Sequence, residues 1–128
     1  MRCNHRGEAS PSAAVQALAG RYRLVAICPE SAGGLATPRP AAELQLDGTV
    51  KTAAGVDVTN AYVRGAEAAV SLARAVGATE AVLKARSPSC GCVDVYDGSF
   101  TRSRRPGQGV TAAALLDAGV AVRSEEDV

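Results

Sequence analysis

Hydrophobic and polar residues along this chain follow two rhythms, one typical of helices and one typical of short buried strands. The longest helix is predicted from Asn60 to Val76, because apolar residues recur there every three or four positions and Gly77 follows as a terminator. Two runs dominated by apolar residues, Tyr22 to Ile27 and Glu80 to Leu83, are predicted as buried strands. The pattern therefore mixes both kinds of element.

Two shorter helices are predicted at the ends of the chain. The first begins at Ser10 as N-cap, with Pro11 at the first helical position, and stops at Gly20. The last runs from Ala112 to Ala118 with Thr111 as its cap. Both combine a polar cap with a nearby glycine stop.

The remaining predicted strands lie next to residues that are typical of turns. Asp47-Gly48, between the runs 43–46 and 49–52, predicts a small antiparallel hairpin. Further strands are predicted at 93–96 and 120–122, and the arginine-rich stretch 101–109 is predicted as a mobile surface loop. Helices alternating with apolar runs predict the α/β class, as one three-layer domain over residues 1–128 with a mainly parallel sheet and a small hairpin insertion.

Two cysteines directly follow the two predicted buried strands. Cys28 comes after Ile27 and opens a stretch to Pro40 that is too rich in proline and glycine for a helix or a ladder. Cys90 follows the run Glu80 to Leu83 through an Arg-Ser-Pro-Ser turn. Because open α/β sheets bind ligands at the carboxyl ends of their strands, the two thiols are expected to share one site.

Charge and composition narrow the classes of function. The formal net charge of +1 gives no basic surplus of the kind that nucleic-acid binding needs. No apolar stretch approaches the roughly 20 residues of a membrane span, and the N-terminus has no signal-peptide core. The expectation is a cytoplasmic protein whose 4 cysteines meet a reducing environment, where clustered thiols are metal ligands or reactive groups.

Several polar side chains accompany the two thiols. Thiolates in a rigid pocket select zinc, copper(I) or an iron-sulfur cluster, while buried inert cysteines are the alternative. Glu30 is a candidate general acid or base, or a solvated loop carboxylate, and Ser89 is a candidate hydrogen-bond donor or ordinary turn material. Arg39, between two prolines, is expected to orient an anion or to pair with Glu43.

Six blocks of sequence, in order and spanning nearly the whole chain, carry a family resemblance. They are Cys28-Pro-Glu-Ser-Ala-Gly-Gly-Leu, Thr37-Pro-Arg-Pro, Gly55-Val-Asp-Val-Thr, Arg86-Ser-Pro-Ser-Cys-Gly, Tyr96-Asp-Gly-Ser-Phe and Gly109-Val-Thr-Ala-Ala-Ala-Leu-Leu. With these blocks the chain resembles domain-of-unknown-function family 523 and the catalytic domain of bacterial thiouracil desulfurases.

The resemblance implies a 4Fe-4S cluster held by three cysteines and a non-redox desulfuration of a small thiolated heterocycle such as a thiouracil. Cys28 and Cys90 match two of the ligand positions. Glu30 and Ser89 are the nearby polar candidates for catalysis. The alternatives are a non-catalytic metal or sulfur carrier, or a binding domain whose cysteines are only packed.

One departure from the family concerns the third ligand. The family begins with an apolar strand ending in Ser-Ala-Cys, then a glycine-containing turn and often a second cysteine. Cys3 matches that second cysteine, so the strand and one ligand before it are absent from this chain. Two explanations are open: the start codon is placed too far downstream, or this member has lost the third ligand and its cluster. Cys3 and Cys92 are the candidate substitute ligands, although Cys92 lies only two residues from Cys90. If the strand is missing, the open sheet edge predicts a homodimer or poor solubility.

Overall fold

The computed structural model describes residues 12–127 and contains four α-helices, six short strands and one 3-10 turn in this range. The helices are α1 (Ala13–Leu18), α2 (Pro29–Ala32), α3 (Thr59–Val76) and α4 (Val110–Asp117). The strands are β1 (Ala42–Leu44), β2 (Val50–Thr52), β3 (Glu80–Leu83), β4 (Asp94–Tyr96), β5 (Arg104–Pro106) and β6 (Ala121–Ser124), and Glu125–Asp127 form the 3-10 turn. The α/β class predicted from the sequence is confirmed.

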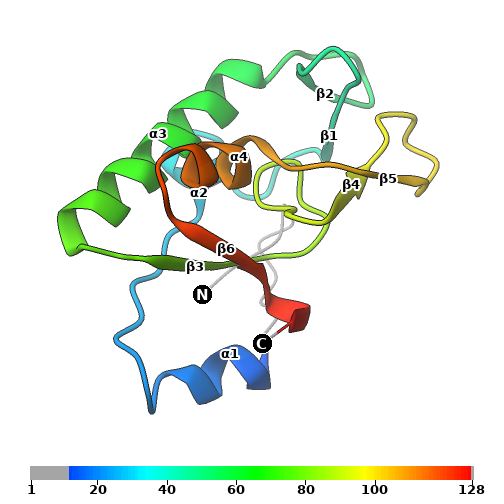
Figure 1. Ribbon diagram of the computed structural model, residues 1–128. Coiled ribbons are helices and arrows are strands. Elements are labelled where there is room, and N and C mark those ends of the chain that lie inside the picture. The colour runs from blue at the N-terminus through cyan, green and yellow to red at the C-terminus, as the bar shows by residue number, and fades with distance from the viewer. Residues whose placement is uncertain (1–11, 128) are drawn as a thin grey trace.

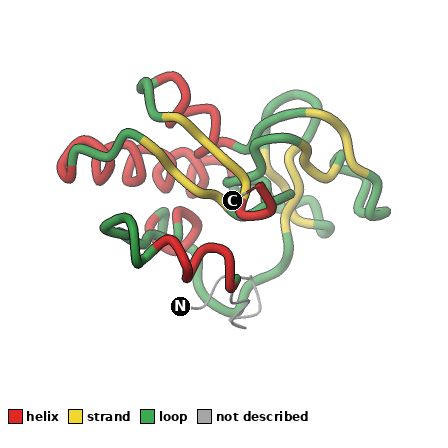
Figure 2. Tube along the Cα trace, turned by 60° about the horizontal axis from the view of Figure 1, so that its bottom comes forward, coloured by secondary structure: helices red, strands yellow, loops and turns green. Residues whose placement is uncertain are grey.

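The strands pair two by two within the described part of the chain. β3 and β6 are parallel, with Glu80 opposite Ala121 and Leu83 opposite Ser124, while β1 with β2 and β4 with β5 are antiparallel. Figures 1 and 2 place the parallel pair between α3 and α4 on one side and α1 on the other. Parallel pairing is thus limited to one pair of strands in residues 12–127.

The core joins the long helix to the two antiparallel hairpins. Leu44, Val50, Tyr62 and Val95 form one buried cluster, contributed by β1, β2, α3 and β4. A second contact joins α3 to α4, where small buried alanines allow the helices to approach closely. Tyr62 is the one large aromatic residue in this core, and it is 2% exposed.

The longest helix follows its sequence pattern. α3 begins one residue before the predicted start and ends at Val76, and Gly77 adopts the left-handed conformation with φ 68° that stops a helix. The Asp47-Gly48 hairpin is also confirmed, with Gly48 at φ 87°. Both features depend on neighbours in sequence, which is why periodicity and turn chemistry found them.

The caps of the two short helices differ from the prediction. Ser12 caps α1, its hydroxyl accepting a hydrogen bond of 3.3 Å from the backbone N–H of Val15. The predicted cap Ser10, together with Pro11, lies outside the described residues. Gly109 is the N-cap of α4, and Thr111 lies inside that helix, fully buried. Thr111 is therefore free to make a tertiary hydrogen bond.

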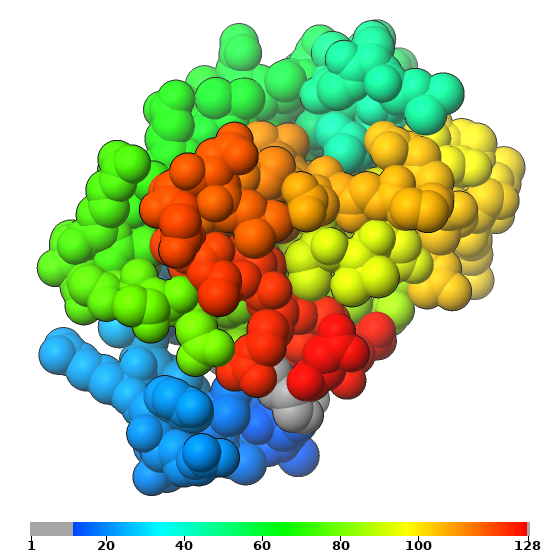
Figure 3. All heavy atoms as spheres, in the orientation of Figure 1, coloured from blue at the N-terminus to red at the C-terminus, as the bar shows by residue number. Residues whose placement is uncertain are grey.

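The predicted strand from Tyr22 to Ile27 is wrong for the structure described. This segment has no regular secondary structure, and Tyr22, Leu24 and Val25 are 46%, 48% and 44% exposed. A strand is stable only when a neighbour pairs with its backbone, and no described strand lies beside this one. Figure 3 shows α1 and the segment after it, in blue, projecting at the bottom of the molecule.

Two predicted loops contain regular structure. The stretch from Cys28 to Pro40 begins with α2, because proline at the first helical position is compatible with a short helix. The stretch 101–109 contains β5, an edge strand that pairs with β4 despite its arginines and proline. No helix within residues 12–127 is long and apolar enough to cross a membrane.

Candidate functional site

The two thiols predicted to share a site are carried by separate loops. Cys28 is the N-cap residue of α2 and is half-buried. Cys90 lies in the turn between β3 and β4, and it is buried. The expected strand before Cys28 is absent and Cys90 lies in the turn well after the end of β3, so neither thiol directly ends a strand as the sequence predicted.

Close backbone contact fixes the segment after Cys28 against α3. A Cβ built on Gly33 would lie 1.9 Å from the carbonyl oxygen of Ala61, and one built on Gly65 would lie 2.0 Å from that of Pro29. The Arg64 guanidinium adds two hydrogen bonds, of 3.1 and 3.0 Å, to the carbonyl oxygen of Gly33. Only glycine permits this approach, so the position of α2 is set by steric contact.

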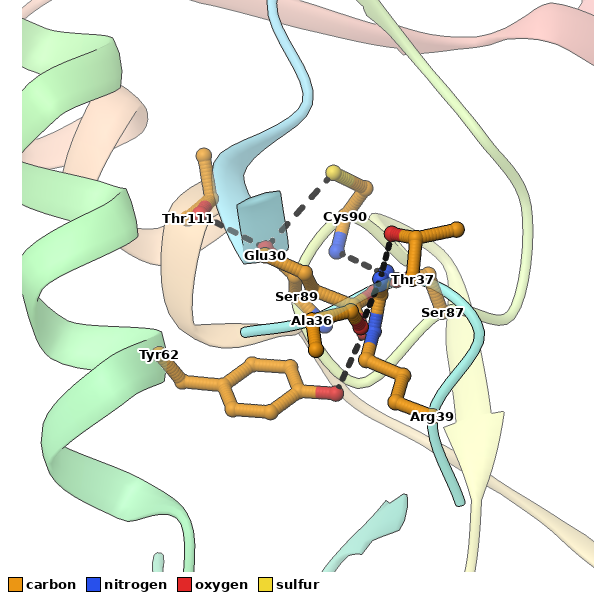
Figure 4. Close-up of polar contacts among 9 residues, drawn as sticks. All are labelled: Glu30, Ala36, Thr37, Arg39, Tyr62, Ser87, Ser89, Cys90 and Thr111. Carbon is orange, nitrogen blue, oxygen red and sulfur yellow. Dashed lines mark hydrogen bonds and ion pairs between the residues drawn. The ribbon is translucent and has the colours of Figure 1, made fainter. Parts of the chain in front are cut away.

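Glu30, the second residue of α2, accepts hydrogen bonds from two distant side chains. The Tyr62 hydroxyl donates to Oε1 over 2.7 Å, and the Nε of Arg39 donates to the same oxygen over 3.2 Å (Figure 4). Arg39 is itself held by bonds from Nη1 to the Ala36 carbonyl and to the Thr37 hydroxyl. Glu30 is thus an anchored carboxylate and not a solvated one.

The loop that carries Cys90 is tied to the start of α4. The Ser87 hydroxyl accepts hydrogen bonds of 3.1 Å from the backbone N–H groups of Ser89 and Cys90. The carbonyl oxygens of Pro88 and Ser89 accept bonds from the first N–H groups of α4, which have no partner inside the helix. Loop and helix therefore form one rigid unit.

Ser89 lies between Cys90 and α4. Its hydroxyl is 2.7 Å from that of Thr111 and accepts a bond of 3.7 Å from the Cys90 thiol. Ser89 is 1% exposed and Thr111 fully buried, so this pair is isolated from bulk water (Figure 4). Gly109 makes the contact possible, because a Cβ there would lie 2.4 Å from the backbone of Ser89.

Burial and neighbouring groups change the pKa of the Cys90 thiol. Burial raises the pKa of the Cys90 thiol to about 12, and the hydrogen bond with Ser89 opposes this change. Electrostatic interaction with Glu30 and with Cys28 raises the same pKa further. Burial, followed by the charge of Glu30, also raises the pKa of Tyr62. That the two thiols share one site stays a prediction.

Other sequence candidates lie elsewhere. The pKa of the half-buried Cys92 is raised by burial and by the charges of Asp127 and Asp94. Arg39 pairs with Glu30 and not with Glu43. Glu43 instead accepts bonds from the N–H groups of Gly98 and Phe100. Cys3 lies outside the described residues.

The donor set fits a thiolate-bound metal group in part. Within residues 12–127, no three histidine, cysteine or acidic side chains are arranged around a single metal position. Cys28 and Cys90 nevertheless supply two soft thiol donors, the ligand type of iron-sulfur clusters. The described residues therefore match two positions of a three-thiolate ligand set.

Sequence reasoning missed two residues of this site. Tyr62 was part of the predicted long helix, and the only available signal was that it is the single aromatic residue of an alanine-rich segment. Thr111 was predicted as a cap, because threonine before an apolar run is typical of that position. Both contacts join residues far apart in the chain, 32 positions for Glu30 with Tyr62 and 22 for Ser89 with Thr111.

Fold and site together define an α/β domain in which an anchored carboxylate follows one thiol and a buried hydroxyl pair adjoins the other. The family model described as 2-thiouracil desulfurase matches residues 1–127. The chain belongs to this family.

Two relatives agree with this assignment. An uncharacterised Bacillus subtilis (strain 168) protein, YbbK, is 38% identical over 137 residues, an alignment that covers 100% of this chain and 91% of YbbK. The solved structure of the 4Fe-4S-dependent thiouracil desulfidase TudS, a DUF523 protein, superposes with a TM-score of 0.89 at 43% identity. That match covers 97% of this chain and 83% of TudS.

Proposed function

We propose that this protein removes sulfur from a small thiolated heterocycle such as 2-thiouracil, with a 4Fe-4S cluster as cofactor. The observation that carries the proposal is the anchored carboxylate of Glu30, which stands two residues after the Cys28 thiol and accepts hydrogen bonds from Tyr62 and Arg39. The similarity to a 4Fe-4S-dependent thiouracil desulfidase at 43% identity supports both the reaction and the cofactor.

Three cysteines are proposed as the protein ligands of the cluster. Cys28 and Cys90 are the two described thiols of the site, and Cys3 is the proposed third, as the family resemblance implies. A cluster with one iron free of protein ligands supplies a Lewis acid for the sulfur of the substrate. Cys92 is left out of the proposed set, because it lies only two residues from Cys90 and is poorly placed to bind the same iron.

The reaction is a hydrolysis without electron transfer. A water oxygen forms a bond to the ring carbon, the carbon-sulfur bond breaks, and the two protons of the water end on the departing sulfide. Glu30 is proposed to accept a proton from the attacking water and to return it to the sulfur, which is general acid-base catalysis. Ser89 is proposed to donate a hydrogen bond to the Cys90 sulfur once that thiol has lost its proton, with the Thr111 hydroxyl then donating to Ser89 across their 2.7 Å contact.

The test is sulfide release from 2-thiouracil by anaerobically reconstituted protein, with iron, acid-labile sulfide and visible absorption measured on the same samples. We expect about one cluster per chain in the starting protein, its loss in Cys28→Ala and Cys90→Ala, and its retention in Cys92→Ala. Cys3→Ala tests the proposed third ligand. A protein that holds the cluster but releases no sulfide would be a metal or sulfur carrier instead.

A further inference from the structure

Glu30 accepts hydrogen bonds from two side chains that are more deeply buried than its own carboxylate. The Glu30 side chain is 18% exposed and that of Arg39 is 8% exposed, while Tyr62 as a residue is 2% exposed. The carboxylate is therefore the most exposed of the three groups. Its two partners lie behind it, inside the protein.

Both hydrogen bonds to Glu30 go to the same carboxylate oxygen. Tyr62 and Arg39 each donate a hydrogen bond to Oε1, and no other described residue bonds Oε2. A carboxylate held at one oxygen by two donors from different directions loses its freedom to rotate. Its second oxygen is left as the acceptor that the reaction uses.

Tyr62 and Arg39 are themselves held in place by further contacts. The Tyr62 ring packs in the core cluster with Leu44, Val50 and Val95, so its hydroxyl position is fixed by the packing of α3. Arg39 is held by two further bonds to the loop of residues 36–37. The glycine contacts between α2 and α3 set the remaining distance. The arrangement is therefore preorganised before any substrate arrives.

We infer that Tyr62, assisted by Arg39, is a positioning residue that holds Glu30 with Oε2 directed to the reacting group. This inference rests on the proposed function for its catalytic consequence. The orientation of the carboxylate is a property of the protein alone, and it is measured separately.

The first experiment measures kinetics in a double-mutant cycle on cluster-loaded protein. Tyr62→Phe keeps the ring and removes only the hydroxyl, and it is expected to lower kcat about tenfold with little change in KM. In a Glu30→Gln background the same change is expected to alter kcat by less than about twofold, because its effect passes through Glu30. Equal losses in both backgrounds would overturn the inference.

The second experiment needs no activity. Infrared difference spectra of the starting protein and Glu30→Gln identify the carboxylate stretching bands of Glu30. Tyr62→Phe is expected to shift these bands, and Tyr22→Phe, at a tyrosine that is 46% exposed, is expected to leave them unchanged. Unchanged bands in Tyr62→Phe would show that its hydroxyl does not hold the carboxylate.

A second variant and a separate measurement distinguish failure of the positioning inference from misfolding and from failure of the proposed function. If Tyr62→Phe does not fold, Arg39→Gln removes the other donor and is expected to give the same band shift and the same fall in kcat. If the cluster-loaded starting protein releases no sulfide, the proposed function fails, while the infrared bands still decide whether Tyr62 orients Glu30.

Discussion

Gly65 and Pro29 touch backbone to backbone: a Cβ on Gly65 would lie 2.0 Å from the carbonyl oxygen of Pro29. Gly65 is in the middle of α3 and Pro29 opens α2, one residue after Cys28. This contact, repeated between Gly33 and Ala61, sets how far Glu30 and Cys28 stand from the long helix. The geometry of the site thus depends on glycines, which have no side chain that could bind or react.

The first prediction concerns this contact. In an ordinary helix, Gly→Ala stabilises by roughly 0.5–1 kcal/mol, but overpacking costs typically about 1–3 kcal/mol. Because the clash is with backbone, Gly65→Ala is expected to lower the free energy of unfolding and to separate Glu30 from Tyr62. Urea denaturation measures the first effect, and the infrared bands of Glu30 measure the second. Ser71→Ala, at an exposed position of the same helix, is the control. A more stable Gly65→Ala protein would contradict the prediction.

The second prediction concerns the buried hydroxyl pair. Thr111→Val keeps the shape of the side chain and leaves the Ser89 hydroxyl without its 2.7 Å partner. A buried polar group that loses its partner costs about 1–3 kcal/mol of stability. Thermal or urea unfolding of the cluster-free protein measures this loss.

A matched series tests the cause. Thr111→Ser keeps the hydroxyl and is expected to lose less stability than Thr111→Val. Combining Thr111→Val with Ser89→Ala removes both polar groups and is expected to recover part of the loss. Strict additivity of the two changes would count against a direct hydroxyl contact.

The third prediction concerns the loop after β4. The Glu43 carboxylate accepts bonds of 3.1 Å from the backbone N–H groups of both Gly98 and Phe100, and Phe100 has the unfavourable φ of 60°. Removing this anchor by Glu43→Ala is expected to speed hydrogen exchange of both amides by at least about tenfold. Glu43→Gln retains an acceptor oxygen and serves as control. Unchanged exchange rates in Glu43→Ala would mean that other contacts hold the loop.

The fourth prediction concerns acid stability. The hydroxyl and then the backbone N–H of Thr49 lower the pKa of Asp47, and Ser99 lowers that of Asp97 in the same way. Both carboxylates bind protons more weakly in the folded state than in the unfolded state. The stability that they contribute is therefore present above about pH 4 and is lost as the pH falls through the folded-state pKa.

Two substitutions test the direction of this dependence of stability on pH. Asp47→Asn is expected to flatten the fall of unfolding free energy below about pH 4, since one titrating group is removed. Thr49→Ala removes the hydroxyl donor and is expected to have a smaller effect in the same direction. Denaturant titrations across this pH range measure both. An acid slope equal to that of the starting protein in Asp47→Asn would show that this turn does not contribute.

The elements found correctly from the sequence are those stabilised by near neighbours. The period of α3, the terminator Gly77 and the Asp47-Gly48 turn act within a few residues, so the pattern of side chains is enough to specify them. The thiols Cys28 and Cys90 were each expected after a strand, and the structure contains such a strand, β3, only before Cys90. The strand expected from Tyr22 to Ile27 was wrong for the opposite reason: a strand needs a partner, and apolar residues alone do not provide one.

Residue types and local breaks in the sequence therefore predicted the candidate groups of the site: two thiols, a carboxylate and a serine. Only the tertiary structure decided how those groups are held. Glu30 binds Tyr62 and Arg39 in place of solvent, and Ser89 binds Thr111, which its own sequence context assigned to a helix cap. These contacts arise because glycines let α2 and α4 approach backbone atoms from distant parts of the chain. Such steric fit depends on three-dimensional packing, and no periodicity along the sequence records it.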